Sequence, residues 1–201
     1  MSYIKVLEKI LDSNDTTTGG GSASALVGAM SCGLIGMVSR LSIMKCYGLT
    51  DKQYIDFKEE LDQINFKLLR GAMEDSKSYC DIESAFSMLK DTSENMETRD
   101  KAILEAALCE IDVELKNANL SKRVIRIGLI LKDNSDSNLK SDLETGIELA
   151  YVALNGSIRT IKDTLVLIKD DNIRDEILEK VLILQEKDTY YEDITNKKQH
   201  W

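Results

Sequence analysis

The segment TTTGGGSASALVGAMSCGLIGMVSRLS, residues 16–42, decides the fold of this chain. From Ala23 to Met44 the sequence is apolar on almost every side, which predicts a central, buried helix. Small residues recur along it at every fourth position in two adjacent ridges: Ala25, Ala29 and Gly33, and Gly28, Cys32 and Gly36. Because small side chains let another helix approach closely, we expect the second ridge to lie in the central core or at a subunit interface.

Outward from this segment, apolar residues keep a helical spacing almost throughout, and no stretch alternates with a period of two for long enough to predict a strand. The 201 residues include no proline, which permits long, uninterrupted helices. Besides residues 23–44, the pattern predicts helices at 4–11, 51–80, 82–89, 93–115, 120–131, 139–168 and 173–184. In the first of these, Ile4, Leu7 and Leu11 should form one face. No linker divides the chain, so we expect an all-α, multihelical single domain over residues 1–201, with long antiparallel helices around the buried small-residue helix.

Composition excludes several classes of function. With 26 Lys and Arg against 35 Asp and Glu, the formal net charge is −9, which argues against sequence-independent nucleic-acid binding. A Ser-His-Asp triad, a Cys-His dyad or a histidine-based zinc site would each depend on His200, the penultimate residue, and we regard all three as excluded. The four cysteines form no C-x-x-C pair and predict no disulfide framework. The start of the chain has no signal-peptide pattern, and the most apolar stretch is shorter than the ~20 residues of a membrane span, so we expect a cytoplasmic protein.

The first candidate site is Gly19-Gly20-Gly21-Ser22, at the start of the buried helix. Glycine allows the backbone to approach a ligand closely, and the first turn of a helix offers unpaired N–H groups at the positive end of its dipole. An anionic group or a developing oxyanion could bind there. The alternative is that Ser22 or Thr18 merely caps the helix.

Two further candidates are acidic. Asp75 falls on the apolar stripe of its helix, where an unpaired carboxylate is costly, and burial would raise its pKa and suit it to proton transfer. The alternative is an ion pair with a Lys or Arg of a neighbouring helix. Asn138, Ser141 and Asp142 should share one face of a helix's first turn. There the alternative is that Asn138 caps the helix and Asp142 interacts favourably with its dipole.

Taken in order, these segments resemble the cyclodeaminase/cyclohydrolase family of folate enzymes. The family's Thr-Pro-Gly-Gly-Gly-Ser segment and alanine-rich helix match residues 16–42, and its Asp-x-x-x-Phe/Tyr motif matches DSKSY, residues 75–79. Its Leu-Pro-Lys turn and following Arg match residues 88–90 and Arg99, its Val-Pro-Leu matches residues 113–115, and its Asn…Ser-Asp segment matches Asn138, Ser141 and Asp142. This chain departs from the pattern at Thr18, Leu89 and Glu114, which replace prolines, and at Thr160 and Thr164, which replace late asparagines.

The resemblance implies an all-helical homodimer that acts on a tetrahydrofolate derivative without a metal or a bound prosthetic group. Family members either hydrolyse 5,10-methenyltetrahydrofolate to 10-formyltetrahydrofolate or cyclise 5-formiminotetrahydrofolate with release of ammonia. It further implies that Asp75 or Asp142 transfers a proton or stabilises the cation. Residues that would bind the substrate are Gly19, Gly20, Gly21, Ser22, Lys90, Arg99, Asn138 and Ser141, with Lys90 and Arg99 on the glutamate tail. The competing hypothesis, motivated by the departures, is a homodimeric binding or interaction protein that kept the fold and lost the reaction.

Overall fold

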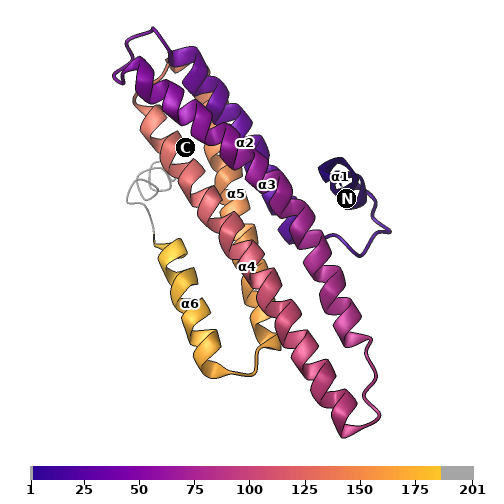
Figure 1. Ribbon diagram of the computed structural model, residues 1–201. Helices are drawn as coiled ribbons and strands as arrows, with labels where there is room; N and C mark the ends of the chain where they lie inside the picture. Colours follow the sequence, from indigo (N-terminus) through magenta and orange to yellow (C-terminus); the bar gives the residue numbers. More distant parts are fainter. Residues whose placement is uncertain (1, 187–201) are drawn as a thin grey trace, which may run out of the picture.

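The computed structural model describes residues 2–186, which form six α-helices (Figure 1). They are α1 (Tyr3–Leu11), α2 (Gly20–Ser42), α3 (Asp51–Phe86), α4 (Ser93–Lys132), α5 (Lys140–Thr164) and α6 (Asp171–Gln185), with 3-10 turns at Ser137–Leu139 and Leu165–Leu167. Helices α2 to α5 run antiparallel as one elongated bundle, α6 lies along α4, and α1 lies to one side near the start of α2 (Figure 1). The all-α prediction is confirmed, and the described residues contain no strand.

Helix α2 is the central element, packed against α3, α4 and α5. A Cβ atom added at Gly28 would lie 3.1 Å from both Leu68 Cδ1 and Ala153 Cβ, so the missing side chain is what allows α3 and α5 to come so close. Cys32 is buried, and this burial raises the pKa of its thiol to about 12. The small-residue ridge of Gly28 and Cys32 therefore lies in the core of the bundle. By length and composition α2 could cross a membrane, but 67% of its most apolar window is buried by the other helices.

The two longest helices correct the sequence prediction. The expected breaks near Cys80 and between Leu115 and Leu120 are absent, and α3 and α4 each run without interruption. No proline occurs at either place, and the residues at both places lie inside regular helix. Both helices begin as expected: Thr50 forms a capping box with Gln53, and Thr92 caps α4.

Helix α1 also differs from expectation. Its predicted inner face, Ile4, Leu7 and Leu11, is exposed, and Val6 is its one fully buried side chain. Val6 packs with Ala25 of α2 and Ala72 of α3 in a small cluster of its own, apart from the main core. A nine-residue helix with one buried anchor is held mainly by its neighbours, because so short a helix is marginal alone.

Candidate functional site

The first turn of α2 contacts the middle of α3 through two buried side chains. Ser22 donates a 2.6 Å hydrogen bond to Asp75 Oδ2, and its hydroxyl also lies 3.0 Å from the Ala72 carbonyl oxygen. The helix begins at Gly20 with Gly19 as its N-cap, and no side chain caps it. The capping interpretation of Ser22 is therefore wrong, because its hydroxyl is used across the helix interface.

Asp75 faces a second carboxyl group, Glu114 of α4. Asp75 is 4% exposed and Glu114 is completely buried. A Cβ atom at Gly21 would collide with Asp75 and lie 2.9 Å from Glu114 Oε1, so Gly21 closes over both carboxyls and must be glycine. The ion pair with a Lys or Arg, offered as the alternative for Asp75, is not formed among residues 2–186.

The electrostatics of this pair follow from its burial. Burial, followed by the charge of Asp75, raises the pKa of Glu114 to about 8. Ser157 and Asn117 act in the opposite direction. Glu114 therefore holds a proton near neutral pH, while Asp75 accepts the hydrogen bond of Ser22. A protonated acid beside a hydrogen-bond-accepting carboxyl is the arrangement that paired acid and base chemistry requires.

Two atoms of the site have no partner within the described chain. Glu114 Oε2 and Ser157 Oγ of α5 are both buried and form no hydrogen bond among residues 2–186. The other oxygen, Oε1, accepts from Asn117 Nδ2 at 3.3 Å. Buried polar atoms are normally satisfied, so these two are available to hydrogen-bond with a water, a ligand or each other.

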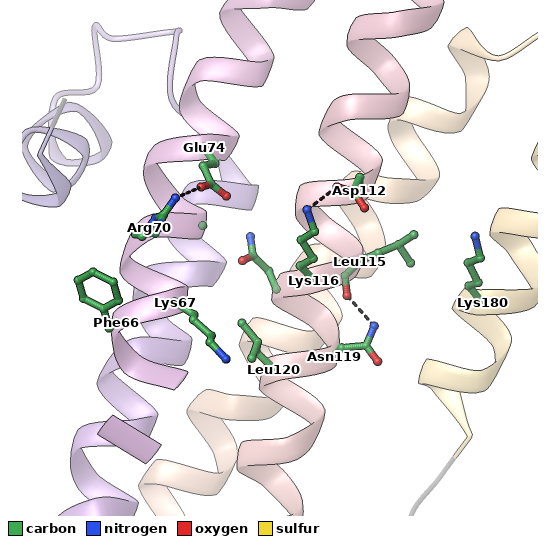
Figure 2. Close-up of a pocket in the computed structure, with 12 residues that line it drawn as sticks. Phe66, Lys67, Arg70, Glu74, Asp112, Leu115, Lys116, Asn119, Leu120 and Lys180 are labelled. Carbon is green, nitrogen blue, oxygen red and sulfur yellow. Dashed lines mark hydrogen bonds and ion pairs between the residues drawn. The ribbon is translucent and has the colours of Figure 1, made fainter. Parts of the chain in front are cut away.

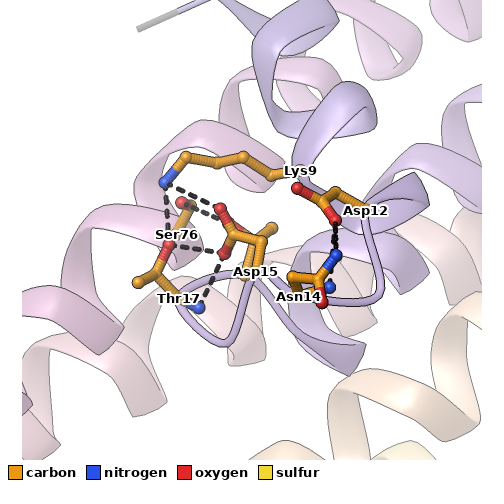
Figure 3. Close-up of polar contacts among 7 residues, drawn as sticks. Lys9, Asp12, Asn14, Asp15, Thr17 and Ser76 are labelled. Carbon is orange, nitrogen blue, oxygen red and sulfur yellow. Dashed lines mark hydrogen bonds and ion pairs between the residues drawn. The ribbon is translucent and has the colours of Figure 1, made fainter.

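The loop before Gly19 is tied to α1 and α3 (Figure 3). Lys9 of α1 donates a 2.8 Å hydrogen bond to Thr17, and Asp15 accepts from the backbone and the hydroxyl of Thr17 at 2.7 Å. Thr18 and Ser76, the neighbour of Asp75, are 3.2 Å apart through their hydroxyl oxygens. These contacts hold the loop that leads into the glycine segment against α1 and α3.

A groove of about 740 Å³ runs between α3 and α4 beside the pair (Figure 2). Gly71 and Asn117 lie at its inner wall, and a Cβ atom at Gly71 would collide with the Asn117 amide. Asn117 thus separates the groove from Glu114. The rim carries the exposed ring of Phe66 and four cationic side chains: Lys67, Arg70, Lys116 and Lys180.

The structure does not bring Asp142 to this site. Gly156 of α5 lies beside Ser24, near the start of α2, whereas Gly146 lies beside Leu34 and Ile35. Asp142 is a further turn away, so about 20 Å of helix separates it from Ser157.

The predicted capping role of Asn138 is also wrong. Asn138 belongs to the 3-10 turn, where its amide donates to Asp136, and Leu139 precedes α5 without a side-chain cap. Ser141 is exposed on the first turn of α5, with Asp142 half-buried beside it. Within one protomer, these three residues form a group separate from Asp75.

The two cations expected to bind a glutamate tail are also remote from the pair. Lys90 is exposed in the connection between α3 and α4. Arg99 donates to the Phe86 carbonyl oxygen at 3.2 Å, and its guanidinium stacks 5.2 Å from the Phe86 ring centroid. Arg99 thus joins the two helix ends at the far tip of the bundle.

Sequence reasoning missed the residues that α4 contributes. Core positions along α4 follow a spacing of three and four, and four consecutive ones are polar: Glu110, Glu114, Asn117 and Ser121. This polar run on an otherwise apolar stripe is the available signal, and the predicted break after Leu115 separates its members. No group of three or more His, Cys, Asp or Glu side chains within residues 2–186 is arranged to hold a metal ion, and His200 lies outside the described residues.

Comparisons with known proteins agree with the resemblance. The chain is 29% identical over 167 residues to a methenyltetrahydrofolate cyclohydrolase of Methylorubrum extorquens, covering 78% of this chain and 77% of the relative. Its fold matches the crystal structure of formiminotetrahydrofolate cyclodeaminase from Thermotoga maritima with a TM-score of 0.78 at 20% identity, over 89% of this chain and 86% of the other. Residues 3–182 match the formiminotransferase-cyclodeaminase family profile. The chain therefore belongs to the formiminotransferase-cyclodeaminase family.

Proposed function

We propose that this chain is a folate-dependent one-carbon enzyme that hydrolyses 5,10-methenyltetrahydrofolate to 10-formyltetrahydrofolate at the Asp75–Glu114 pair. The observation that carries the proposal is a buried carboxyl pair with no cationic partner among the described residues. The methenyl group is an amidinium-like cation, and a carboxylate in a water-poor site stabilises such a charge strongly. The similarity of this chain to a methenyltetrahydrofolate cyclohydrolase supports the same reaction.

The pair supplies the proton transfers that hydrolysis needs. Asp75 takes a proton from the attacking water as the C–O bond forms at the methenyl carbon. Glu114, protonated near neutral pH, gives its proton to N5 as the C–N5 bond breaks, and the resulting Glu114 carboxylate takes the remaining hydroxyl proton as the formyl C=O bond forms. Ser22 holds Asp75 in place, and the unpartnered Ser157 hydroxyl is available to the water or to the new carbonyl oxygen.

The groove between α3 and α4 is the place we assign to the rest of the substrate. Asn117 forms its wall beside Glu114, so the one-carbon unit would enter past this amide. Arg70 and Lys116 form ion pairs within their own helices. Lys67 and Lys180 form no ion pair among residues 2–186. They are therefore available to bind the carboxylates of the glutamate tail.

Cyclodeamination of 5-formiminotetrahydrofolate is the second candidate reaction. It is favoured by the proton on Glu114, because the departing nitrogen must be protonated to leave as ammonia. Both reactions involve the same carbon and the same two carboxyls. The substrate that turns over distinguishes them.

The test is the decay of the methenyltetrahydrofolate chromophore with purified protein, beside a blank without enzyme because the compound hydrolyses unaided. We expect Asp75→Asn to lower the enzymatic rate on the order of 10²-fold or more, with an unchanged melting temperature. Asp142→Asn is the matched control and should keep the rate if one protomer holds the whole site.

No acceleration by the wild type would contradict hydrolysis and direct the assay to 5-formiminotetrahydrofolate and ammonia release. Inactivity with both folates would favour the alternative, a binding or interaction protein of the same fold.

Three further features belong to the proposal. The reaction uses side chains and water, so dialysis against a chelator should leave the rate unchanged.

The enzyme acts as a homodimer, for which the exposed apolar residues of α2, Met30 and Leu41, offer a contact face. Met30→Lys should then lower the mass measured by light scattering, whereas Leu11→Lys on α1 should not. A cytoplasmic location, without membrane or nucleic-acid partners, stays a prediction.

A further inference from the structure

A third buried carboxyl group, Glu110, lies one helical turn before Glu114 on α4 and has no part in the reaction as written above. Glu110 is 5% exposed. Thr164, at the end of α5, donates a 2.6 Å hydrogen bond to Glu110 Oε2. No Lys or Arg among residues 2–186 forms an ion pair with it. Glu110 is therefore a buried acid held by a neutral hydroxyl, which leaves it free to gain and lose a proton.

Its neighbours on α3 connect it to the pair and to the surface. Burial raises the pKa of Glu110, and the charge of Asp75 raises it further. One turn beyond Asp75 is Tyr79, whose ring is partly exposed. The pKa of Tyr79 is raised mainly by the charge of the exposed Glu83, then by burial, and also by the charge of Glu110. Asp75, Tyr79 and Glu83 are four residues apart along one face of α3, so this face leads from the enclosed pair to exposed side chains.

The proposed reaction requires such a connection because it does not conserve protons at the pair. When water adds to the methenyl cation, one of its protons ends on N5 and the other must leave the site. Cyclodeamination of a neutral formimino group needs one proton to enter. Asp75 and Glu114 are buried behind Gly21 and Asn117, which hinders direct exchange of their protons with bulk water.

We propose that Glu110 is the residue through which the Asp75–Glu114 pair exchanges its proton with solvent, with Thr164 holding the Glu110 carboxyl in position and Tyr79 next on the way out. This inference rests on the proposed function. In each hydrolytic cycle the pair passes one proton to the Glu110 carboxylate, and Glu110 releases it outward before the next substrate binds. No bond other than O–H is made or broken, and no oxidant or reductant is needed.

Glu114 and Thr164 lie around the same buried acids, Glu114 as a member of the pair and Thr164 as the hydrogen-bond partner of Glu110.

The experiment compares Glu110→Gln with Glu105→Gln, an exposed acid of the same helix, in methenyltetrahydrofolate hydrolysis. Glu110→Gln should lower kcat on the order of 10²-fold and leave KM unchanged. Small diffusible buffers, imidazole and formate, should restore its kcat in proportion to their concentration, because they can carry the proton instead. The wild type and Glu105→Gln should show no such buffer dependence.

Thr164→Val provides a second test should Glu110→Gln fold poorly, with Thr160→Val as its control. Thr164→Val should lower kcat less than Glu110→Gln does and respond to the same buffers. An active wild type with an unaffected Glu110→Gln variant, or a loss that no buffer restores in both variants, would overturn the relay and leave the proposed function intact. A wild type inactive with both folates would overturn the two together.

Discussion

The Ser22 hydroxyl donates a 2.6 Å hydrogen bond to Asp75, joining residues 53 positions apart in the chain. This contact brings the N-terminus of the most apolar helix against an acid on the helix that follows it. Ser22 is the third residue of α2, so its position depends on where the glycine segment starts the helix. The glycine segment thus helps to form the acid site because it fixes where α2 begins. This role does not depend on a bound ligand.

Gly21→Ala should damage the site, whereas Gly20→Ala should not. A Cβ atom at position 21 displaces Asp75 and Glu114, which are buried and have no space to move, while at position 20 it meets nothing within 4 Å. We expect Gly21→Ala to lose activity by about 10-fold or more through misplacement of the acids. Gly20→Ala should keep activity and gain up to about 1 kcal/mol in stability from its better helix propensity. Rates and thermal melts of the two variants test this prediction. Equal activity would show that the carboxyl pair tolerates a side chain at position 21.

The raised pKa of Glu114 predicts how stability depends on pH. Its pKa is about 8 in the folded protein against 4.5 for the ordinary group, so between these values the folded state binds more protons than the unfolded state. The contribution of Glu114 is therefore complete below about pH 4.5 and is lost as the pH rises through about 8. Glu114→Gln should flatten the fall in unfolding free energy between these limits, whereas Glu105→Gln should leave it unchanged.

Denaturant titrations at several pH values measure this effect. Subtracting the wild-type curve from that of Glu114→Gln removes the contributions of the other acids. Wild-type and Glu114→Gln free energies that stay parallel through this range would mean that Glu114 is already charged in the folded protein. The acid role of Glu114 would then be wrong.

The two lysines of the groove should affect substrate binding more than turnover. Lys67→Glu and Lys180→Glu each reverse a charge at the rim, and we expect KM for the folate to rise about 5-fold per site with little change in kcat. Lys90→Glu is the matched control, because Lys90 is an exposed lysine outside the groove. The effect should shrink at high salt and with a substrate that lacks the glutamate. A rise in KM for Lys90→Glu alone would instead favour binding of the glutamate tail at Lys90, as the family resemblance implies.

The sequence was sufficient for the parts of the molecule that depend on local pattern. The apolar, small-residue α2, the helix starts at residues 51 and 93 and the position of Asp75 on a buried stripe were all predicted and are confirmed. Glu114 was not identified, because the partner of a buried acid is set by the register between helices, which one sequence does not reveal. Asp142 was grouped with Asp75 by resemblance alone, and only the direction of α5 shows how far apart they lie in one protomer.

The last prediction concerns the packing of α2. It distinguishes the small residues of α2 that lie in the core from those that lie on the surface. A Cβ atom at Gly28 already meets Leu68, Ala153 and the Ser121 hydroxyl at 3.1 to 3.4 Å, so Gly28→Leu must push α3 and α5 away. We expect a loss of about 1–3 kcal/mol or more in unfolding free energy from this overpacking. Gly33 has nothing within 4 Å, and Gly33→Leu should leave the folded protomer at least as stable. If Gly33→Leu instead changes the oligomeric mass while Gly28→Leu changes only the melting temperature, the exposed side of α2 is the subunit contact and the Gly28 ridge is purely internal.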